Sequence, residues 1–215
     1  MTRLNPSSLG LNFTSKTHCD TYTAIDPATD PALYTGKIVL ITGAAKGIGC
    51  AIVVLYTKAG AMRITITAWG NASWGYIDIL VNNAGYLVPF VPLGKGDKVL
   101  GSMDKTIVNV TSVGALVLTL GTSVYQTSKL AVLRLSEYLI GLIVYSVYPV
   151  SVVTDLATVC NDTPELAGDS IVYLTSKRRE WLAGRYVSCA WDMLELIGRE
   201  YEIVERNLLK LQMNF

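Results

Sequence analysis

The amino-acid sequence predicts a doubly wound α/β protein built on a mostly parallel sheet. Short, largely apolar runs rich in β-branched residues alternate with longer segments of helical periodicity, which is typical of repeated strand–helix–strand units. Apolar residues make up 51% of the chain and charged residues only 16%. A large share of the chain should therefore be buried, as in a sheet that helices cover on both faces. A length of 215 residues is sufficient for one domain with a sizeable core.

Residues 1–35 are expected to form an N-terminal arm, and residues 36–215 a single domain. The arm is polar and rich in Thr, Ser, Asp and Pro, which is typical of loops packed on a domain. The one histidine of the chain, His18, lies in this arm. We interpret it as a surface or packing residue.

The first strand is predicted at residues 37–42 (KIVLIT), and a helix at residues 48–59. Two further strands, at residues 63–68 and 77–81, follow closely, with only residues 69–76 between their apolar cores. A parallel crossover normally takes a dozen or more residues and a helix. Eight residues span at most about 26–29 Å, so we expect a bare extended crossing. The predicted connection between these two strands therefore contains no helix.

The second half of the chain continues the alternation. TIVNV at residues 106–110 reads as a buried strand, and residues 125–140 form the strongest helix pattern. Thr163 followed by Pro164 predicts a helix start, with Thr at the N-cap. Further strands are predicted at residues 142–148 and 186–189. The stripe expected to face the core on the 125–140 helix consists of Leu130, Leu133, Leu135, Tyr138 and Leu139.

Composition excludes several classes of protein. A net charge of +1 gives no sign of a nucleic-acid or anionic-membrane partner, and the basic run Lys177–Arg179 is expected to be a solvated helix end. The uncharged stretches 106–128 and 138–154 are interpreted as buried strands and not as membrane spans. Four cysteines without a CxxC pair predict reduced, buried thiols in a cytoplasmic protein, with no disulfide framework and no metal site.

The segment TGAAKGIG, residues 42–49, carries the pattern of a phosphate-binding turn between a strand and a helix. Gly43 would permit the tight turn, Gly47 would let the backbone approach a pyrophosphate, and Gly49 would allow close packing of the helix. The helix N-terminus would supply N–H groups and a positive dipole. A glycine-rich turn alone is equally compatible with a structural role.

Tyr125 and Lys129 stand four residues apart, so one helix face would carry both. A nearby ammonium group stabilises a phenolate, which makes Tyr125 a candidate acid/base. Ser112 follows a predicted strand end, where its hydroxyl could bond a substrate carbonyl. Taken singly, the pair is also compatible with a surface contact, and Ser112 with an ordinary loop serine.

The order of these motifs resembles the short-chain dehydrogenase/reductase (SDR) family, notably its fungal oxidoreductases. TGAAKGIG follows the first strand, NNAGYL a middle strand and SVGAL the next one, and YQTSKLAVLRL forms the following helix. The resemblance extends over residues 36–193 and implies a Rossmann-like fold.

The resemblance implies an enzyme that interconverts an alcohol and a carbonyl by hydride transfer with a nicotinamide cofactor. Tyr125 would be the acid/base, Lys129 would lower the pKa of Tyr125 and bind the ribose, and Ser112 would orient the carbonyl. The other residues implied to contact the cofactor are Gly43, Lys46, Gly47, Ile48, Gly49, Asn83, Ala84, Gly85, Val152 and Thr154.

NADP is expected in preference to NAD. The end of the second strand, Thr67-Ala68-Trp69, lacks the acidic residue that binds a ribose 2′-hydroxyl, and Lys46 offers a cation for a 2′-phosphate. The substrate would be a small molecule whose identity the sequence leaves open, as it does the formation of a homo-oligomer.

Three departures from the family pattern favour an alternative, a catalytically inactive SDR-fold remnant or binding protein. At residues 69–76 the family has a helix, a third strand and another helix, none of which this chain contains, so the resemblance implies an incomplete sheet without the third strand and its neighbouring helices. A Pro/Gly-rich stretch at residues 87–105 replaces the family helix that carries an active-site Asn. No residue takes over the role of that Asn. Val150 stands where the family has the Gly of a Pro-Gly pair. A side chain therefore occupies a position where the family's backbone approaches the nicotinamide.

Overall fold

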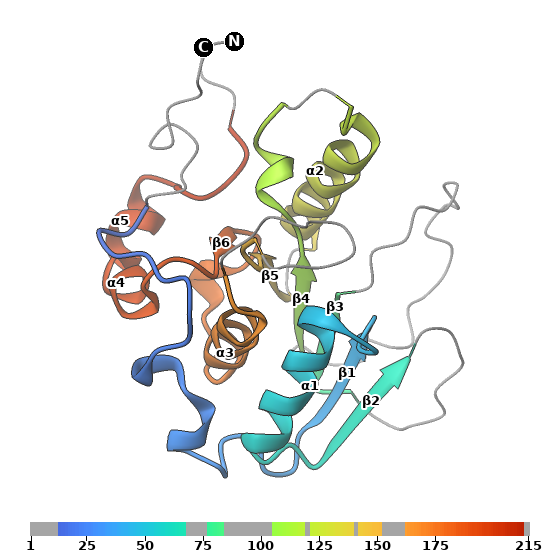
Figure 1. Cartoon of the computed structure of the whole chain (residues 1–215). Coiled ribbons are helices and arrows are strands. Elements are labelled where there is room, and N and C mark those ends of the chain that lie inside the picture. The colour runs from blue at the N-terminus through green and yellow to red at the C-terminus, as the bar shows by residue number, and fades with distance from the viewer. Residues whose placement is uncertain are drawn as a thin grey trace.

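The computed structural model describes residues 13–67, 77–83, 105–118, 121–139, 142–151 and 162–212. Within these ranges the core is a six-stranded sheet with the order β2-β1-β3-β4-β5-β6 (Figure 1), and every neighbouring pair of strands is parallel. The strands are β1 (Ile38–Thr42), β2 (Arg63–Thr67), β3 (Ile79–Asn82), β4 (Thr106–Val110), β5 (Ile143–Tyr148) and β6 (Tyr186–Ser188). The prediction of a doubly wound, mostly parallel α/β sheet is confirmed.

The strands before and after the short crossing lie on opposite sides of β1, as expected. Val39 of β1 pairs with Ile64 of β2 on one side and with Ile79 of β3 on the other. The crossing itself and the Pro/Gly-rich stretch lie outside the described residues, apart from Lys105. β2 is the outermost strand of the sheet in the described residues. The third strand that was expected to be missing would lie next to β2, on its outer side.

Helices cover the sheet on both sides. The helices are α1 (Gly47–Lys58), α2 (Ser123–Tyr138), α3 (Pro164–Thr175), α4 (Met193–Gly198) and α5 (Glu200–Glu205). Figure 1 shows α1 and α3 side by side in front of the sheet, and α2 behind it, packed on β4 and β5. Gly168 of α3 allows the close approach of α1, because a Cβ there would lie 2.3 Å from Leu55 Cδ1.

The predicted start of α3 is confirmed. The prediction of a solvated basic run after this helix is right for Lys177 and Arg178, which are exposed, and wrong for Arg179. Thr163 Oγ1 accepts a hydrogen bond from Leu166 N at 3.4 Å, and Pro164 is the first helical residue. Arg179 is not solvated but 7% exposed. Its guanidinium donates to the carbonyl oxygens of Tyr173 and Leu174 at 3.1 and 2.7 Å, and it thereby caps the C-terminus of α3.

The stripe predicted to face the core on α2 is wrong except at Leu133, which is 1% exposed. Leu130, Leu135 and Tyr138 are exposed, with Tyr138 at 75%. The face that meets the sheet instead carries polar groups that bond to β4. These bonds, and not the distribution of apolar residues, determine which face of α2 is buried. The buried residues of α2 are Gln126, Leu133 and Ser136.

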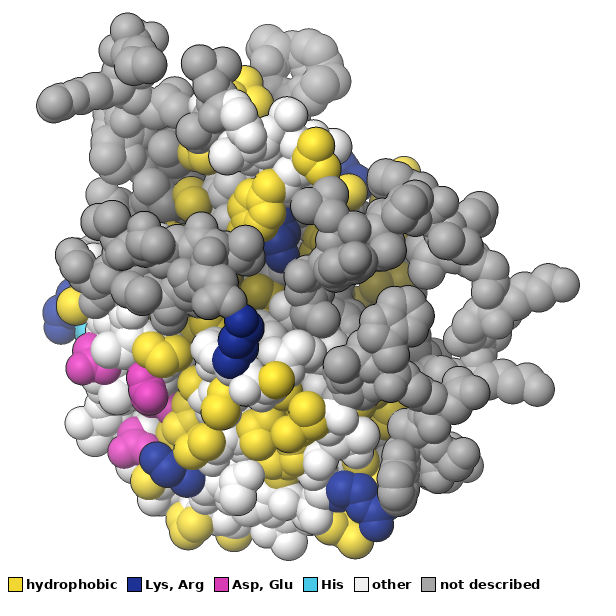
Figure 2. Space-filling view, turned by 45° about the vertical axis from the view of Figure 1, so that its right-hand side comes forward, with side chains coloured by type: hydrophobic (Ala, Val, Ile, Leu, Met, Phe, Trp, Pro, Cys, Tyr) yellow, Lys and Arg dark blue, Asp and Glu magenta, His cyan; other side chains and the backbone are white. Residues whose placement is uncertain are grey.

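Apolar side chains are also exposed near the outer edge of the sheet. Val54 on α1, Met62 just before β2 and Ile66 on β2 are 46%, 68% and 55% exposed. Figure 2 shows a group of hydrophobic side chains on the lower part of the face that it presents. Apolar surface at an outermost strand is the feature expected of a sheet that has lost its next strand.

The cysteine prediction is only partly right. Cys19, Cys50 and Cys189 are free thiols, but Cys19 and Cys50 are exposed and only Cys189 is buried. Cys160 lies outside the described residues. Among the residues that the structure describes, no group of His, Cys, Asp and Glu could hold a metal ion.

The described part of the arm, residues 13–35, runs across the ends of β6 and α3 and is fastened by polar contacts. The carboxylate of Glu195 accepts hydrogen bonds from Ser15 N at 2.7 and 2.8 Å. Arg199 donates to the carbonyl oxygen of Phe13 and stacks 3.9 Å from its ring centroid. Thr21 Oγ1 donates to the buried carboxylate of Asp169 on α3.

We predict that Asp169→Asn raises the stability of the folded chain at neutral pH. Burial raises the pKa of Asp169 to about 6; Asp26 and Glu165 add to this effect, whereas Thr21 and Lys58 oppose it. A carboxyl group whose folded-state pKa is raised stabilises the fold below pH 4, and this contribution is lost as the pH rises through 6. The gain from Asp169→Asn should therefore grow between pH 4 and 6.5, to about 1–3 kcal/mol.

Thermal unfolding of both proteins between pH 4 and 8 measures this difference. Asp30→Asn is the matched control, because Asp30 is exposed and its side chain accepts a single bond from Ala32 N. A difference between Asp169→Asn and the parent chain that does not change with pH would contradict the assignment.

Candidate active site

The residues predicted to form the site follow the carboxyl ends of neighbouring strands. Gly43 comes after β1, Asn83 after β3, Ser112 after β4 and Val150 after β5. All four strands are parallel, so these ends meet at one edge of the sheet. In open α/β sheets, ligands bind in the crevice at this edge, where the chain crosses from one side of the first strand to the other.

The glycine turn has the geometry that its residues predict. Gly43 and Gly47 have φ values of 64° and 58°, in the left-handed region that favours glycine. A Cβ on Gly49 would lie 2.3 Å from the carbonyl oxygen of Gly43 and 2.6 Å from Asn83 Nδ2. The turn can therefore close against β3 only with glycine at position 49.

The N-terminus of α1 points out of this turn. Its N-cap residue, Lys46, has an extended backbone and makes no side-chain cap bond. Lys46 and Gly47 are exposed and Ile48 is half-buried. The first N–H groups of a helix lack intrahelical acceptors, and a phosphate can accept from them. The turn and this terminus therefore fit the diphosphate of a dinucleotide.

Ser112, Gly114 and Tyr125 lie together. Ser112 is 9% exposed, and its Oγ accepts a hydrogen bond from Gly114 N at 3.0 Å. A Cβ on Gly114 would lie 3.3 Å from both Ser112 Oγ and Tyr125 Cε1. The absence of a side chain at position 114 thus lets the hydroxyl group and the aromatic ring approach each other.

Lys129 joins the same group from the next turn of α2. Its Nζ lies 5.8 Å from the centroid of the Tyr125 ring and donates to the carbonyl oxygen of Val110 at 3.0 Å. Burial lowers the pKa of Lys129, because desolvation disfavours the ammonium ion. Tyr125 is 41% exposed, so its ring can be reached from outside.

Val150 has an unusual backbone conformation, with φ of 69° at a side chain that is 6% exposed. A β-branched residue rarely adopts this conformation, which glycine adopts readily. The position thus has the backbone that a Pro-Gly pair would favour, but it carries a side chain. Four residues predicted to contact the cofactor lie outside the described residues: Ala84, Gly85, Val152 and Thr154.

Sequence reasoning missed a buried polar chain that supports α2. Asn82 Nδ2 donates to Asn109 Oδ1, and Asn109 Nδ2 donates to Ser136 Oγ, each at 2.9 Å. Thr111 Oγ1 also donates to the carbonyl oxygen of Lys129 at 3.0 Å. The polar Asn109 within an otherwise apolar strand was the signal that could have predicted a bond to the helix.

Comparison with known proteins places this architecture in a family of oxidoreductases. The chain is 31% identical to a short chain dehydrogenase of Monascus purpureus, over 97% of this chain and 98% of that protein. It is 32% identical to another from Monascus ruber, over 93% of each. No family model matches the chain.

Solved structures show the same fold. The structure of BdcA in complex with NADPH has a TM-score of 0.57 and 19% identity, covering 74% of this chain and 96% of that one. The ligand-free aldohexose dehydrogenase of Thermoplasma acidophilum has a TM-score of 0.57 and 21% identity, covering 75% and 95%. The chain belongs to the short-chain dehydrogenase/reductase family of NAD(P)-dependent oxidoreductases.

The alignment with the Monascus purpureus relative spans 289 positions, more than the 215 residues of this chain. The relative therefore has residues opposite gaps in this chain. This agrees with the expectation that internal segments of the family pattern are missing. In the described part of the chain, no helix is both long and apolar enough to cross a membrane.

We predict that Gly49→Ala destabilises the fold by about 1–3 kcal/mol, because the new Cβ would overlap backbone of the glycine turn. Gly198→Ala is the matched control, since a Cβ there would meet nothing within 4 Å. Chemical denaturation of both variants measures the effect. Equal stabilities would show that the turn relaxes freely and that the close contact imposes no constraint.

Proposed function

We propose that this chain is an NADP-dependent oxidoreductase that interconverts an alcohol and a carbonyl on a small-molecule substrate, with Tyr125 as the acid/base. The observation that carries the proposal is the grouping of Ser112, Tyr125 and Lys129 around Gly114 at the carboxyl edge of the sheet. The wide spacing of the cysteines is in keeping with a cytoplasmic enzyme.

Each of the three side chains has a separate role in the proposed reaction. The Ser112 hydroxyl, fixed by Gly114 N, orients the substrate oxygen. The Tyr125 hydroxyl gives a proton to that oxygen during reduction and takes one during oxidation. The Lys129 ammonium, held by the carbonyl oxygen of Val110, stabilises the phenolate form of Tyr125.

The residues described at the glycine turn fit a dinucleotide, which when bound would supply or accept the hydride. Gly43, Gly47, Ile48 and Gly49 would line its diphosphate, and Asn83 would lie along it, together with Ala84 and Gly85. Lys46, exposed at the N-terminus of α1, would bind a 2′-phosphate and favour NADP over NAD. Val152 and Thr154 would meet the nicotinamide amide group.

A second candidate function is a catalytically inactive protein of the same fold that binds a ligand. The buried side chain of Val150 favours it, because this side chain stands where the family brings backbone to the nicotinamide. Cofactor binding separates the two candidates, since an obstructed site would not respond to either nucleotide.

We predict that saturating NADPH raises the thermal unfolding temperature of the chain. A ligand at 100 times its dissociation constant adds about 2.7 kcal/mol to the free energy of unfolding. NADPH should act more strongly than NADH, because only NADPH offers a 2′-phosphate to Lys46. A cooperative transition that neither nucleotide moves would favour the inactive candidate.

We predict that Tyr125→Phe lowers NADPH-dependent reduction of carbonyl substrates by about 10²–10⁴-fold, the usual contribution of a positioned acid/base. The NADPH-induced shift in unfolding should persist, because the phenol oxygen is the one atom removed. Tyr138→Phe is the control on the same helix, since Tyr138 is exposed. Reduction that survives Tyr125→Phe unchanged would exclude the proposed mechanism.

A further inference from the structure

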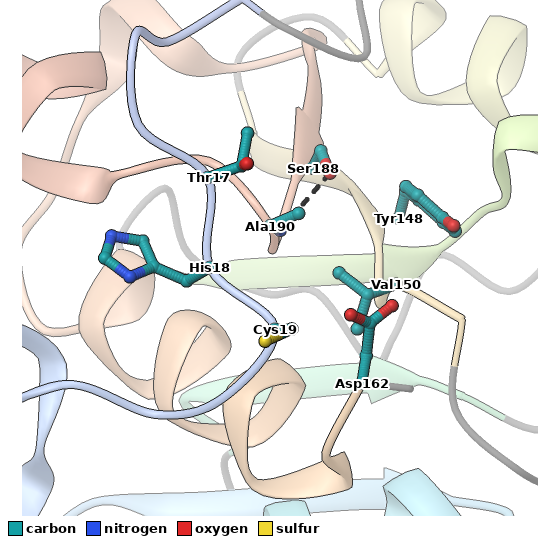
Figure 3. Close-up of a pocket in the computed structure, with 8 residues that line it drawn as sticks. All are labelled: Thr17, His18, Cys19, Tyr148, Val150, Asp162, Ser188 and Ala190. Atoms are coloured by element: carbon teal, nitrogen blue, oxygen red, sulfur yellow. Dashed lines mark hydrogen bonds between the residues drawn. The ribbon is translucent and has the colours of Figure 1, made fainter. Parts of the chain in front are cut away.

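A cavity of about 340 Å³ lies at the carboxyl ends of β5 and β6, under the N-terminal arm (Figure 3). The arm contributes Cys19, the end of β5 contributes Tyr148 and Val150, and the end of β6 contributes Ser188. Asp162 lies beside Val150 in the close-up view. The volume falls within the range of small-molecule pockets.

This cavity lies at the same edge of the sheet as Ser112. Thr111 N donates to the carbonyl oxygen of Val147 at 2.8 Å, so the pairing of β4 with β5 extends past the end of β4. Neighbouring strands lie about 4.8 Å apart, which puts Ser112 next to Pro149 and Val150. Ser112 therefore lies near Val150, which lines the cavity.

Hydrogen bonds hold the walls of the cavity in place. His18 N donates to the carbonyl oxygen of Ala190 at 2.7 Å, and Thr163 N donates to that of Cys19 at 3.0 Å. Ser151 N donates to Asp162 Oδ2 at 2.9 Å. The first two of these bonds join the arm to distant parts of the sequence, so the cavity is formed without a ligand.

The side chains that line the cavity disfavour negatively charged ligands. The described residues that line the cavity include no Lys or Arg, and they include the carboxylate of Asp162. The ring of His18, a further lining residue, is hydrogen-bonded through Nε2 to Asp192 Oδ2 at 3.1 Å. Ser188 is 1% exposed, and its Oγ accepts from Ala190 N at 3.3 Å. Among the described residues its hydroxyl proton has no acceptor, so it is available to an oxygen in the cavity. A donor and a carboxylate acceptor together suit hydroxyl groups and disfavour anions.

We infer that the cavity is a substrate subsite for an uncharged, hydroxyl-bearing group, and that Asp162 sets its selectivity against anions. The inference rests on the proposed oxidoreductase function, because it takes the group to be the part of the substrate remote from the reacting carbonyl. The selectivity itself can be measured without turnover, through the exposed thiol of Cys19.

The test compares reagents of opposite charge at Cys19. The full chain carries Cys50→Ser and Cys160→Ser, and Cys189 is buried. Labelling rates are measured at low salt with the cationic trimethylammonium-ethyl and the anionic sulfonatoethyl methanethiosulfonates. The ratio of the cationic to the anionic labelling rate at Cys19 should exceed the same ratio at Cys50, which is measured in a chain that carries Cys19→Ser and Cys160→Ser. Asp162→Asn should lower the ratio at Cys19 about tenfold.

Asp162→Asn keeps an oxygen acceptor for Ser151 N, so the cavity walls should stay in place. Asp30→Asn removes a carboxylate outside the cavity lining and should leave the ratio unchanged. Equal ratios at Cys19 and Cys50, or a ratio at Cys19 that Asp162→Asn leaves unchanged, would overturn the role of Asp162.

Protection of Cys19 tests occupancy of the cavity. 4-Hydroxyacetophenone should slow alkylation of Cys19 by iodoacetamide several-fold more than 4-acetylbenzoate does, and Asp162→Asn should remove this difference. Failure of both ketones to protect Cys19 would overturn the subsite. If Cys19 shows the predicted selectivity while NADPH leaves unfolding unchanged, the oxidoreductase proposal fails and the selectivity of the cavity stands.

Discussion

The contact between the Asn83 side chain and the glycine turn is the interaction on which the rest of the site depends. Asn83 Nδ2 donates to the carbonyl oxygens of Thr42 and Gly43 at 3.1 and 3.0 Å, and Asn83 N donates to Thr42 Oγ1 at 3.1 Å. These bonds join the carboxyl ends of β1 and β3, which only three residue pairs connect along the strands. Gly49 is tied to the same contact, because any side chain there would push Asn83 away. The direction of α1, and with it the position of the N–H groups proposed to bind phosphate, follows from this one junction.

On the other side of the sheet, hydrogen bonds more than apolar contacts set the position of α2. Hydrogen bonds of 2.9–3.0 Å join α2 to β4 and to the residue that follows it. Ser136 bonds to Asn109 near one end of the contact, and Lys129 bonds to Val110 and Thr111 near the other. A buried polar network permits fewer alternative packings than an apolar face does, because each shift would leave a donor or an acceptor unpaired. The network thus fixes the rotation of α2, and this rotation decides whether Tyr125 faces Ser112. A helix with an apolar face could rotate by several degrees at little cost, and the distance between the two hydroxyl groups would change with it.

The fold could be predicted from the sequence further than the detail of the site could. The runs of β-branched residues identified each of the strands in the described part of the chain, and the glycine spacing identified the turn, because both signals are local. The face of α2 was predicted wrongly, since an apolar count contains no information about Asn109 on a strand 27 residues away. Arg179 was missed for the same reason, because its burial depends on the carbonyl groups that end α3. The Thr21–Asp169 bond joins residues 148 positions apart, a distance over which no sequence pattern operates.

Val150 is the residue at which the two halves of the site meet. It borders the region proposed for the nicotinamide and also lines the cavity beneath the arm. Its left-handed backbone is unfavourable for a β-branched residue by about 1–2 kcal/mol. Burial of the side chain contributes about 1.5–3 kcal/mol in the opposite direction, so the conformation can persist without a glycine. The register of β4 and β5 puts Ser112 beside Pro149 and Val150. A substrate that extends from Ser112 into the proposed subsite would therefore contact the Val150 side chain, and the arm and the cofactor region would both act on a single bound molecule.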